Sequence, residues 1–185
     1  MRRYSRYSRY RTKTHDISLV RYRINKLEFD KGGNYMSACL FIASDMPLAE
    51  FAPSQDYPIE RDMDKGTIHD GGADDNYFLI SFESVKDYTD KNYGVFLEWY
   101  YTDGRARQII EYIKAALRKS DRIEFWHVWL DYYEFENRPF IHKKTIPLSE
   151  LTTKHVKEIN DGVIWNTPDK MYPTRPSFYC LTVTR

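Results

Sequence analysis

Cysteine is scarce in this chain, which has two in 185 residues, Cys39 and Cys180. Each lies in an apolar run with the composition of a β-strand, so the sequence predicts two buried thiols rather than a disulfide. No CxxC pair and no Cys/His cluster is present, and the sequence therefore offers no zinc site. We expect no bound metal and no cofactor.

Long hydrophobic runs are missing as well. No apolar stretch reaches the ~18 residues that a membrane-spanning helix needs, and the N-terminus lacks the apolar segment of a secretory signal. An Arg- and Ser-rich start is also typical of mitochondrial presequences, but this one has no Leu or Ala face for an amphipathic helix. We expect no membrane partner and a cytoplasmic location.

The common catalytic signatures are absent. The sequence contains no GxSxG, no GxxxxGK[ST] and no GxGxxG, so serine hydrolases, nucleotide hydrolases and Rossmann enzymes lose their usual markers. Tyr88 and Lys91 have the YxxK spacing of rolling-circle nucleases, but such nucleases also need two histidines separated by one residue. No such pair occurs in the sequence. These absences favour a protein that is not an enzyme.

Aromatic residues and an uneven charge distribution are what the chain does have. Aromatic side chains make up 16% of the residues, a share typical of sheet-rich cores and of binding surfaces. Residues 1–26 carry nine cationic side chains and one carboxylate, a net charge of +8, so the remainder carries −7 to give the total of +1. This pattern is typical of a polyanion-binding arm on an anionic body, or of an arm that folds onto its own acidic domain.

The arm, residues 1–14, contains the repeat RRYSRYSRYR, with a period of three residues. Polyproline II has three residues per turn, so in that conformation arginines would line one edge and tyrosines another. Proteins bind single-stranded nucleic acid with arginine cations that contact the phosphates and aromatic rings that stack on the bases. We expect an arm that is flexible when free and binds nucleic acid; the alternative is a solubilising tail without a target. The predicted contact residues are Arg2, Arg3, Arg6, Arg9, Arg11, Tyr4, Tyr7 and Tyr10.

Residues 15–185 are expected to form one α+β domain. Strands and helices in the order β-β-β-β-α-β-β-α-β predict a mostly antiparallel sheet of about seven strands with two helices. We expect one hairpin at the DKGGN turn and another at ENRP. The predicted strands are 17–29, 35–43, 76–84, 94–101, 122–135, 140–148 and 177–185. The predicted helices are 103–120 and a second one that begins at about Ser149 or Thr152 and ends at Asn160.

The interval of residues 44–76 is predicted to be a long acidic loop. Asp62, Asp64 and Gly66 have a spacing that resembles a calcium loop, but the glycine and the final glutamate of an EF-hand are not at the required positions. We expect either a solvated loop or one that presents carboxylates to a basic partner, as phosphate-mimicking inhibitors do. The predicted partner-binding residues are Asp62, Asp64, Asp70, Asp74 and Asp75.

The only catalytic candidates are His127 and Asp131. On strict alternation they share one face of the strand 122–135 with Trp129 and Tyr133. One interpretation is a general base beside an aromatic wall, and the other is a semi-buried sheet face whose histidine hydrogen-bonds locally. His127 and His142 are also expected to approach each other across the ENRP turn.

A short basic arm, RRYSRYSRYR, ahead of a strand-rich domain resembles the layout of small viral coat proteins, in which the arm meets packaged nucleic acid. In size and in its Tyr- and Asp-rich surface, the chain is also similar to accessory proteins of phages and mobile elements, including inhibitors of CRISPR nucleases. We therefore predict a non-enzymatic binding protein of phage, virus or mobile-element type. Its most concrete form is an inhibitor of a host nucleic-acid-processing complex, with nucleic acid and/or a protein of that complex as partner. A coat-like packaging protein and a metal-dependent nuclease are the alternatives.

Overall fold

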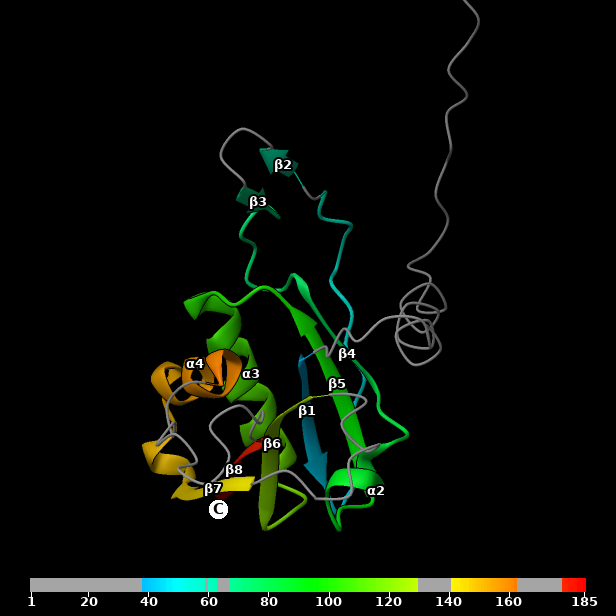
Figure 1. The fold of residues 1–185 in the computed structure, drawn as a ribbon, viewed down its shortest axis with the longest axis vertical. Coiled ribbons are helices and arrows are strands. Elements are labelled where there is room, and N and C mark those ends of the chain that lie inside the picture. Colours follow the sequence, from blue (N-terminus) through cyan, green and yellow to red (C-terminus); the bar gives the residue numbers. More distant parts are fainter. Residues whose placement is uncertain (1–37, 59, 63–66, 130–140, 163–177) are drawn as a thin grey trace, which may run out of the picture.

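The computed structural model describes residues 38–58, 60–62, 67–129, 141–162 and 178–185. Its centre is a six-stranded sheet with the strand order β4-β5-β1-β6-β8-β7 (Figure 1). The strands are β4 (Tyr77–Ser81), β5 (Tyr93–Trp99), β1 (Ala38–Ser44), β6 (Arg122–Trp129), β8 (Phe178–Thr184) and β7 (Ile141–Pro147). The helices of the described part are α2 (Val85–Tyr88), α3 (Asp103–Ala116), α4 (Thr153–Asp161) and the short 3-10 helix η2 (Leu148–Glu150). The predicted α+β class is confirmed.

The sheet is mixed rather than purely antiparallel. β7 and β8 run parallel, whereas the other four neighbouring pairs are antiparallel. The expectation of about seven mostly antiparallel strands is therefore close, but it is inexact in the number of strands and it missed the parallel pair.

The hairpin expected at the DKGGN turn lies outside the described residues. Within those residues, β1 pairs with β5 on one side and with β6 on the other, with Phe41 opposite both Phe96 and Trp126. The hairpin expected at ENRP is wrong. β7 pairs with β8, which lies between it and β6. The ENRP segment therefore does not join two neighbouring strands.

Helices α3 and α4 lie on one face of the sheet (Figure 1). α3 begins after Thr102, whose hydroxyl accepts a hydrogen bond from the Arg105 amide at 3.1 Å, and it buries Ile109 and Ile113 completely. α4 buries Val156 and Ile159 and ends at a glycine in the left-handed conformation. Each buried isoleucine stabilises the fold by roughly 1.5–3 kcal/mol relative to an exposed one. Both predicted helices are confirmed, and their apolar stripes pack against the sheet.

The opposite face of the sheet carries an aromatic cluster around Phe41. The centre of this ring lies 4.9 Å from that of Phe82 and 5.8 Å from that of the stacked Trp126 ring. Cys39 and Cys180 are buried in the same cluster as free thiols, which confirms the prediction for both. Burial raises the pKa of the Cys180 thiol to about 12, so at neutral pH it carries its proton.

The interval predicted as a loop contains two short strands, β2 (Glu60–Asp62) and β3 (Thr67–His69). They pair antiparallel, with Glu60 opposite His69, and form a two-stranded hairpin separate from the main sheet. Figure 1 shows this hairpin projecting beyond the end of the sheet. Strands of three residues are too short for their alternation to be recognised in a sequence.

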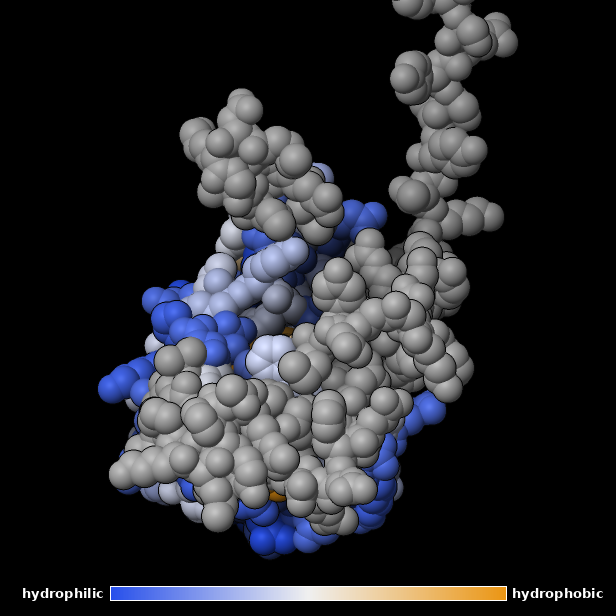
Figure 2. All heavy atoms as spheres, viewed as in Figure 1, coloured by the Kyte–Doolittle hydropathy of each residue, from blue (hydrophilic) through white to orange (hydrophobic). Residues whose placement is uncertain are grey.

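On the face shown in Figure 2, the described residues present mainly hydrophilic side chains. No helix among the described residues is long and apolar enough to span a membrane.

Candidate partner-binding site

Three of the predicted partner-binding carboxylates come together at the base of the projecting hairpin. Asp70, Asp74 and Asp75 follow β3 directly, at the point where the chain returns toward β4. Gly71 and Gly72 between them have φ angles of 77° and 66°, which glycine adopts without strain. The Gly72 amide donates to Asp70 Oδ1 at 3.2 Å and closes this turn. The base is thus a structured turn.

Arg105 of α3 fastens the turn to the body. Its side chain is completely buried, and Nη1 donates to Asp70 Oδ2 at 2.6 Å and to the Tyr100 carbonyl at 2.8 Å. Its Nε donates to the Ala73 carbonyl at 2.8 Å. The hydrogen bond and the positive charge of Arg105 hold the pKa of Asp70 below its usual value. Asp70 therefore has an internal partner, which the sequence did not indicate.

Asp75 ties together the segments that enter and leave the hairpin. Its Oδ1 accepts a hydrogen bond from the Tyr57 hydroxyl at 2.5 Å, and its Oδ2 accepts one from the Ser54 hydroxyl at 2.7 Å. These hydrogen bonds, that from Tyr57 above all, lower the pKa of Asp75. Ser54 and Tyr57 precede β2, whereas Asp75 follows β3, so both ends of the hairpin are held at one place.

Asp74 is exposed, and its carboxylate lies against the first turn of α3, beside Gly104. A Cβ built on Gly104 would overlap the Asp74 carboxylate, so this helix start leaves room for the acidic side chain only because residue 104 is glycine. Of the other two predicted partner-binding residues, Asp62 lies in β2, and Asp64 lies outside the described residues.

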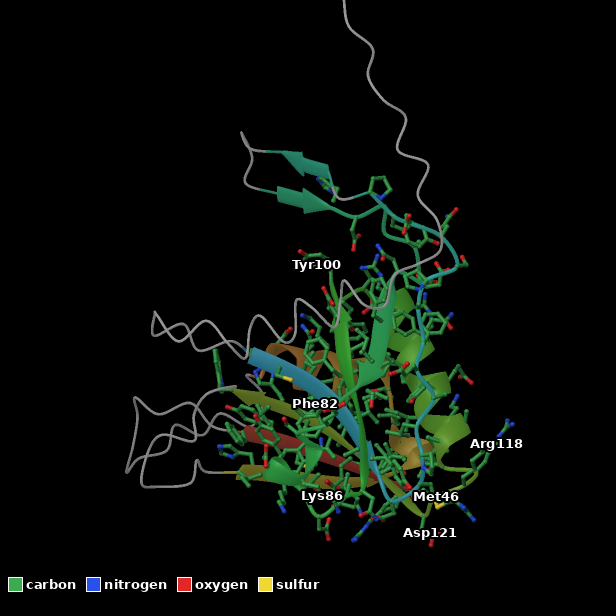
Figure 3. The ribbon with its side chains drawn as sticks, turned by 90° about the vertical axis from the view of Figure 1, so that its right-hand side faces the viewer. Met46, Phe82, Lys86, Tyr100, Arg118 and Asp121 are labelled. Atoms are coloured by element: carbon green, nitrogen blue, oxygen red, sulfur yellow. The ribbon has the colours of Figure 1, made fainter. Side chains whose placement is uncertain are left out.

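Tyr100 projects beside the hairpin base (Figure 3). With 52% of its surface exposed, it is the most exposed of the large apolar side chains in the described residues. The backbone of Tyr100 is held in place, because its carbonyl accepts a hydrogen bond from the buried Arg105 at 2.8 Å. An aromatic ring on a fixed backbone is a common energetic centre of protein interfaces. Sequence reasoning missed it, because the predicted strand 94–101 included Tyr100, whereas β5 ends at Trp99.

His127 lies on the helix-covered side of β6. Its ring is 5% exposed, and its Nδ1 lies 2.8 Å from the carbonyl oxygen of Ile159 near the end of α4. Burial lowers the pKa of His127, so the ring is neutral at pH 7. In this position it links β6 to the C-terminus of α4. Asp131, the other catalytic candidate, lies outside the described residues.

The expected approach of His127 to His142 is wrong, because β8 separates their strands. Tyr179 of β8 is the cross-strand neighbour of both residues. Its ring stacks on His142 with centres 5.1 Å apart and meets the edge of His127 at 6.0 Å. An aromatic residue therefore occupies the place where a metal shared by the two histidines would have to bind.

Within the part of the chain that the structure describes, no three His, Cys, Asp or Glu side chains are arranged to hold a metal ion. The arm residues predicted to bind nucleic acid, Arg2 to Arg11, lie outside that part. No protein-family model, curated protein or solved structure matches the chain.

Proposed function

We propose that this chain is a non-enzymatic binding protein, of phage, virus or mobile-element type, that inhibits a host nucleic-acid-processing complex. The observation that carries the proposal is the β2–β3 hairpin, which projects from the sheet while Arg105 and Asp75 hold its base. A projecting element whose base is fixed loses little conformational entropy on binding, so more of its contact energy appears as affinity.

The charge of the hairpin side of the chain supports a basic partner. The described residues between 56 and 75 carry six carboxylates and one cationic side chain, Arg61, a net charge of −5. The carboxylates belong to Asp56, Glu60, Asp62, Asp70, Asp74 and Asp75. A protein that handles nucleic acid presents a basic surface to phosphates, and an acidic hairpin complements the same surface.

The residues at the site divide into two groups in this proposal. Asp70 and Asp75 build the base, because their carboxylates already have internal partners. Glu60 and Asp62, which lie in β2, and the exposed Tyr100 contact the partner. The Arg/Tyr arm, residues 1–14, engages the nucleic acid of the complex, or an acidic surface of it.

Affinity capture from a host lysate, with and without nuclease treatment, tests the proposal. We expect a protein that the full chain retains after nuclease treatment and that the double variant Glu60→Lys/Asp62→Lys no longer retains. The matched control is Glu111→Lys/Glu150→Lys, which reverses two exposed carboxylates on α3 and η2. A protein lost on nuclease treatment, or held equally by both variants, would refute the hairpin as the inhibitory contact.

A further inference from the structure

A hollow of about 200 Å³ opens where β4 ends and β5 begins, at the other end of the sheet from the hairpin. Figure 3 labels Phe82 and Lys86, which line it. Its apolar walls come from Pro47, Leu48, Phe82 and Val85. Its polar lining includes Glu50, Glu83, Lys86 and Asn92, with the ring of Tyr93 beside them.

The floor of the hollow is firmly packed because residue 94 is glycine. A Cβ on Gly94 would lie 2.9 Å from the Cβ of Val85, so a larger residue would push α2 away from β5. The Phe82 amide also donates to the Gly94 carbonyl at 2.9 Å. The hollow is thus built by regular backbone contacts rather than by a loose loop.

Two of the charged groups in the lining have internal partners. Lys86 Nζ donates to the Asn92 side chain at 2.6 Å, and Glu50 Oε1 accepts from the Ser81 amide at 2.8 Å. Glu83 is exposed and makes no hydrogen bond or ion pair with the described residues. Tyr93 is 44% exposed. A carboxylate and an aromatic ring therefore remain available at the mouth of an apolar hollow.

We infer that this hollow binds an arginine side chain from a basic segment of a protein partner. The aliphatic stem lies along the apolar walls, and the guanidinium pairs with Glu83 and packs on the Tyr93 ring. The lining of the hollow holds two carboxylates, those of Glu50 and Glu83, against one cation, Lys86, so its net charge favours a cation. This inference rests on the proposed binding function, since it names a second contact with the basic partner and the residue that it receives.

A titration of the full chain with N-acetyl-arginine amide, followed by NMR, tests the inference. We expect shifts of the Glu83, Asn92 and Tyr93 resonances, with a dissociation constant on the order of 1 mM. The uncharged analogue N-acetyl-citrulline amide should cause none of these shifts. Glu83→Gln should weaken binding about three- to tenfold, and Glu111→Gln, an exposed carboxylate on α3, should not change it.

Equal shifts with the citrulline analogue, or binding that survives Glu83→Gln unchanged, would overturn the inference. A second control replaces Arg2, Arg3, Arg6, Arg9 and Arg11 by serine without any probe. If the Glu83, Asn92 and Tyr93 resonances shift in this variant, the chain's own arm occupies the hollow, and the inference of an external partner is overturned. The Glu60→Lys/Asp62→Lys variant should bind the arginine probe normally. Failure of the hairpin contact and failure of the hollow can therefore be told apart.

Discussion

The guanidinium of Arg105 lies 2.6 Å from the carboxylate of Asp70, with the arginine side chain completely shielded from solvent. This ion pair joins the first turn of α3 to the base of the projecting hairpin. The Nη2 atom of Arg105 has no hydrogen-bond partner in the described part of the chain. Among the described residues, Asp70 provides the counter-charge that offsets the desolvation of the buried cation, and the position of the hairpin depends on this pair.

Asp70→Asn should destabilise the protein by about 3–5 kcal/mol, because it leaves the buried Arg105 cation without a counter-charge. Urea unfolding at pH 7 measures this loss. The double variant Arg105→Met/Asp70→Asn should recover part of it, since the unpaired charge is then gone. Losses that simply add in the double variant would show that the two side chains do not act as a pair.

Two carboxylates at the hairpin base, Asp70 and Asp75, predict that the free energy of unfolding depends on pH in the acidic range. The folded-state pKa values of Asp70 and Asp75 are both lowered, so both carboxylates stabilise the fold fully above their unfolded pKa of about 3.9. That contribution is lost as the pH falls through the lower folded values. The free energy of unfolding should therefore fall between about pH 5 and pH 2, and less steeply in Asp70→Asn. If the free energy of unfolding of Asp70→Asn fell with pH as steeply as that of the unchanged protein, Asp70 would not contribute to the pH dependence.

The lowered pKa of His127 predicts a second pH range over which the free energy of unfolding changes. Burial lowers the folded-state pKa of this ring, so below about pH 6.5 the unfolded chain takes up a proton that the folded chain does not. Stability should therefore fall as the pH is lowered through this range, and His127→Leu should remove that part of the slope. The pKa of His155 is also lowered, so His155→Asn is the control that keeps the His127 contribution. Unfolding midpoints at several pH values between 7.5 and 5 measure both.

Which of these features the sequence could predict depends on how local their signals are. α3 was found because Ile109, Ile110 and Ile113 recur at helical spacing after a good cap. The role of Arg105 was not found, because nothing in its neighbourhood distinguishes it from Arg107, and its partner Asp70 is 35 residues away.

Pairing between strands was missed for the same reason. β7 and β8 are separated by α4, so neither turn chemistry nor alternation indicated that they run side by side and parallel. The faces of β6 were separated correctly, because alternation places Phe125 and Trp126 on opposite sides of the sheet. The structure shows that Phe125 lies in the helix-covered cluster and Trp126 in the aromatic one.

Lys91 is a second buried cation, and its ion pair with Asp45 predicts which of two substitutions destabilises the protein more. Its side chain is completely buried and its Nζ lies 2.7 Å from Asp45 Oδ2, whereas the Asp45 side chain is half exposed. Asp45→Ala should therefore be clearly more destabilising than Lys91→Met, since the first leaves a buried charge unpaired and the second leaves a carboxylate that water can solvate. Thermal unfolding of both variants at pH 7 decides this. The reverse order would mean that Asp90, at 4.0 Å, is a sufficient partner for Lys91.

The Arg/Tyr arm predicts that binding of single-stranded nucleic acid depends on salt. If the five arginines Arg2, Arg3, Arg6, Arg9 and Arg11 each neutralise one phosphate, the slope of log K against log salt should be about −3.5 from the arm alone, and their replacement by alanine should remove it. Replacement of Tyr4, Tyr7 and Tyr10 by alanine should weaken binding by ~1–3 kcal/mol per stacked base and leave the slope unchanged, because stacking releases no counterions. Fluorescence anisotropy of a mixed-sequence oligonucleotide at several salt concentrations separates the two effects. An affinity that does not change when residues 1–14 are deleted would mean that the arm is a solubilising tail.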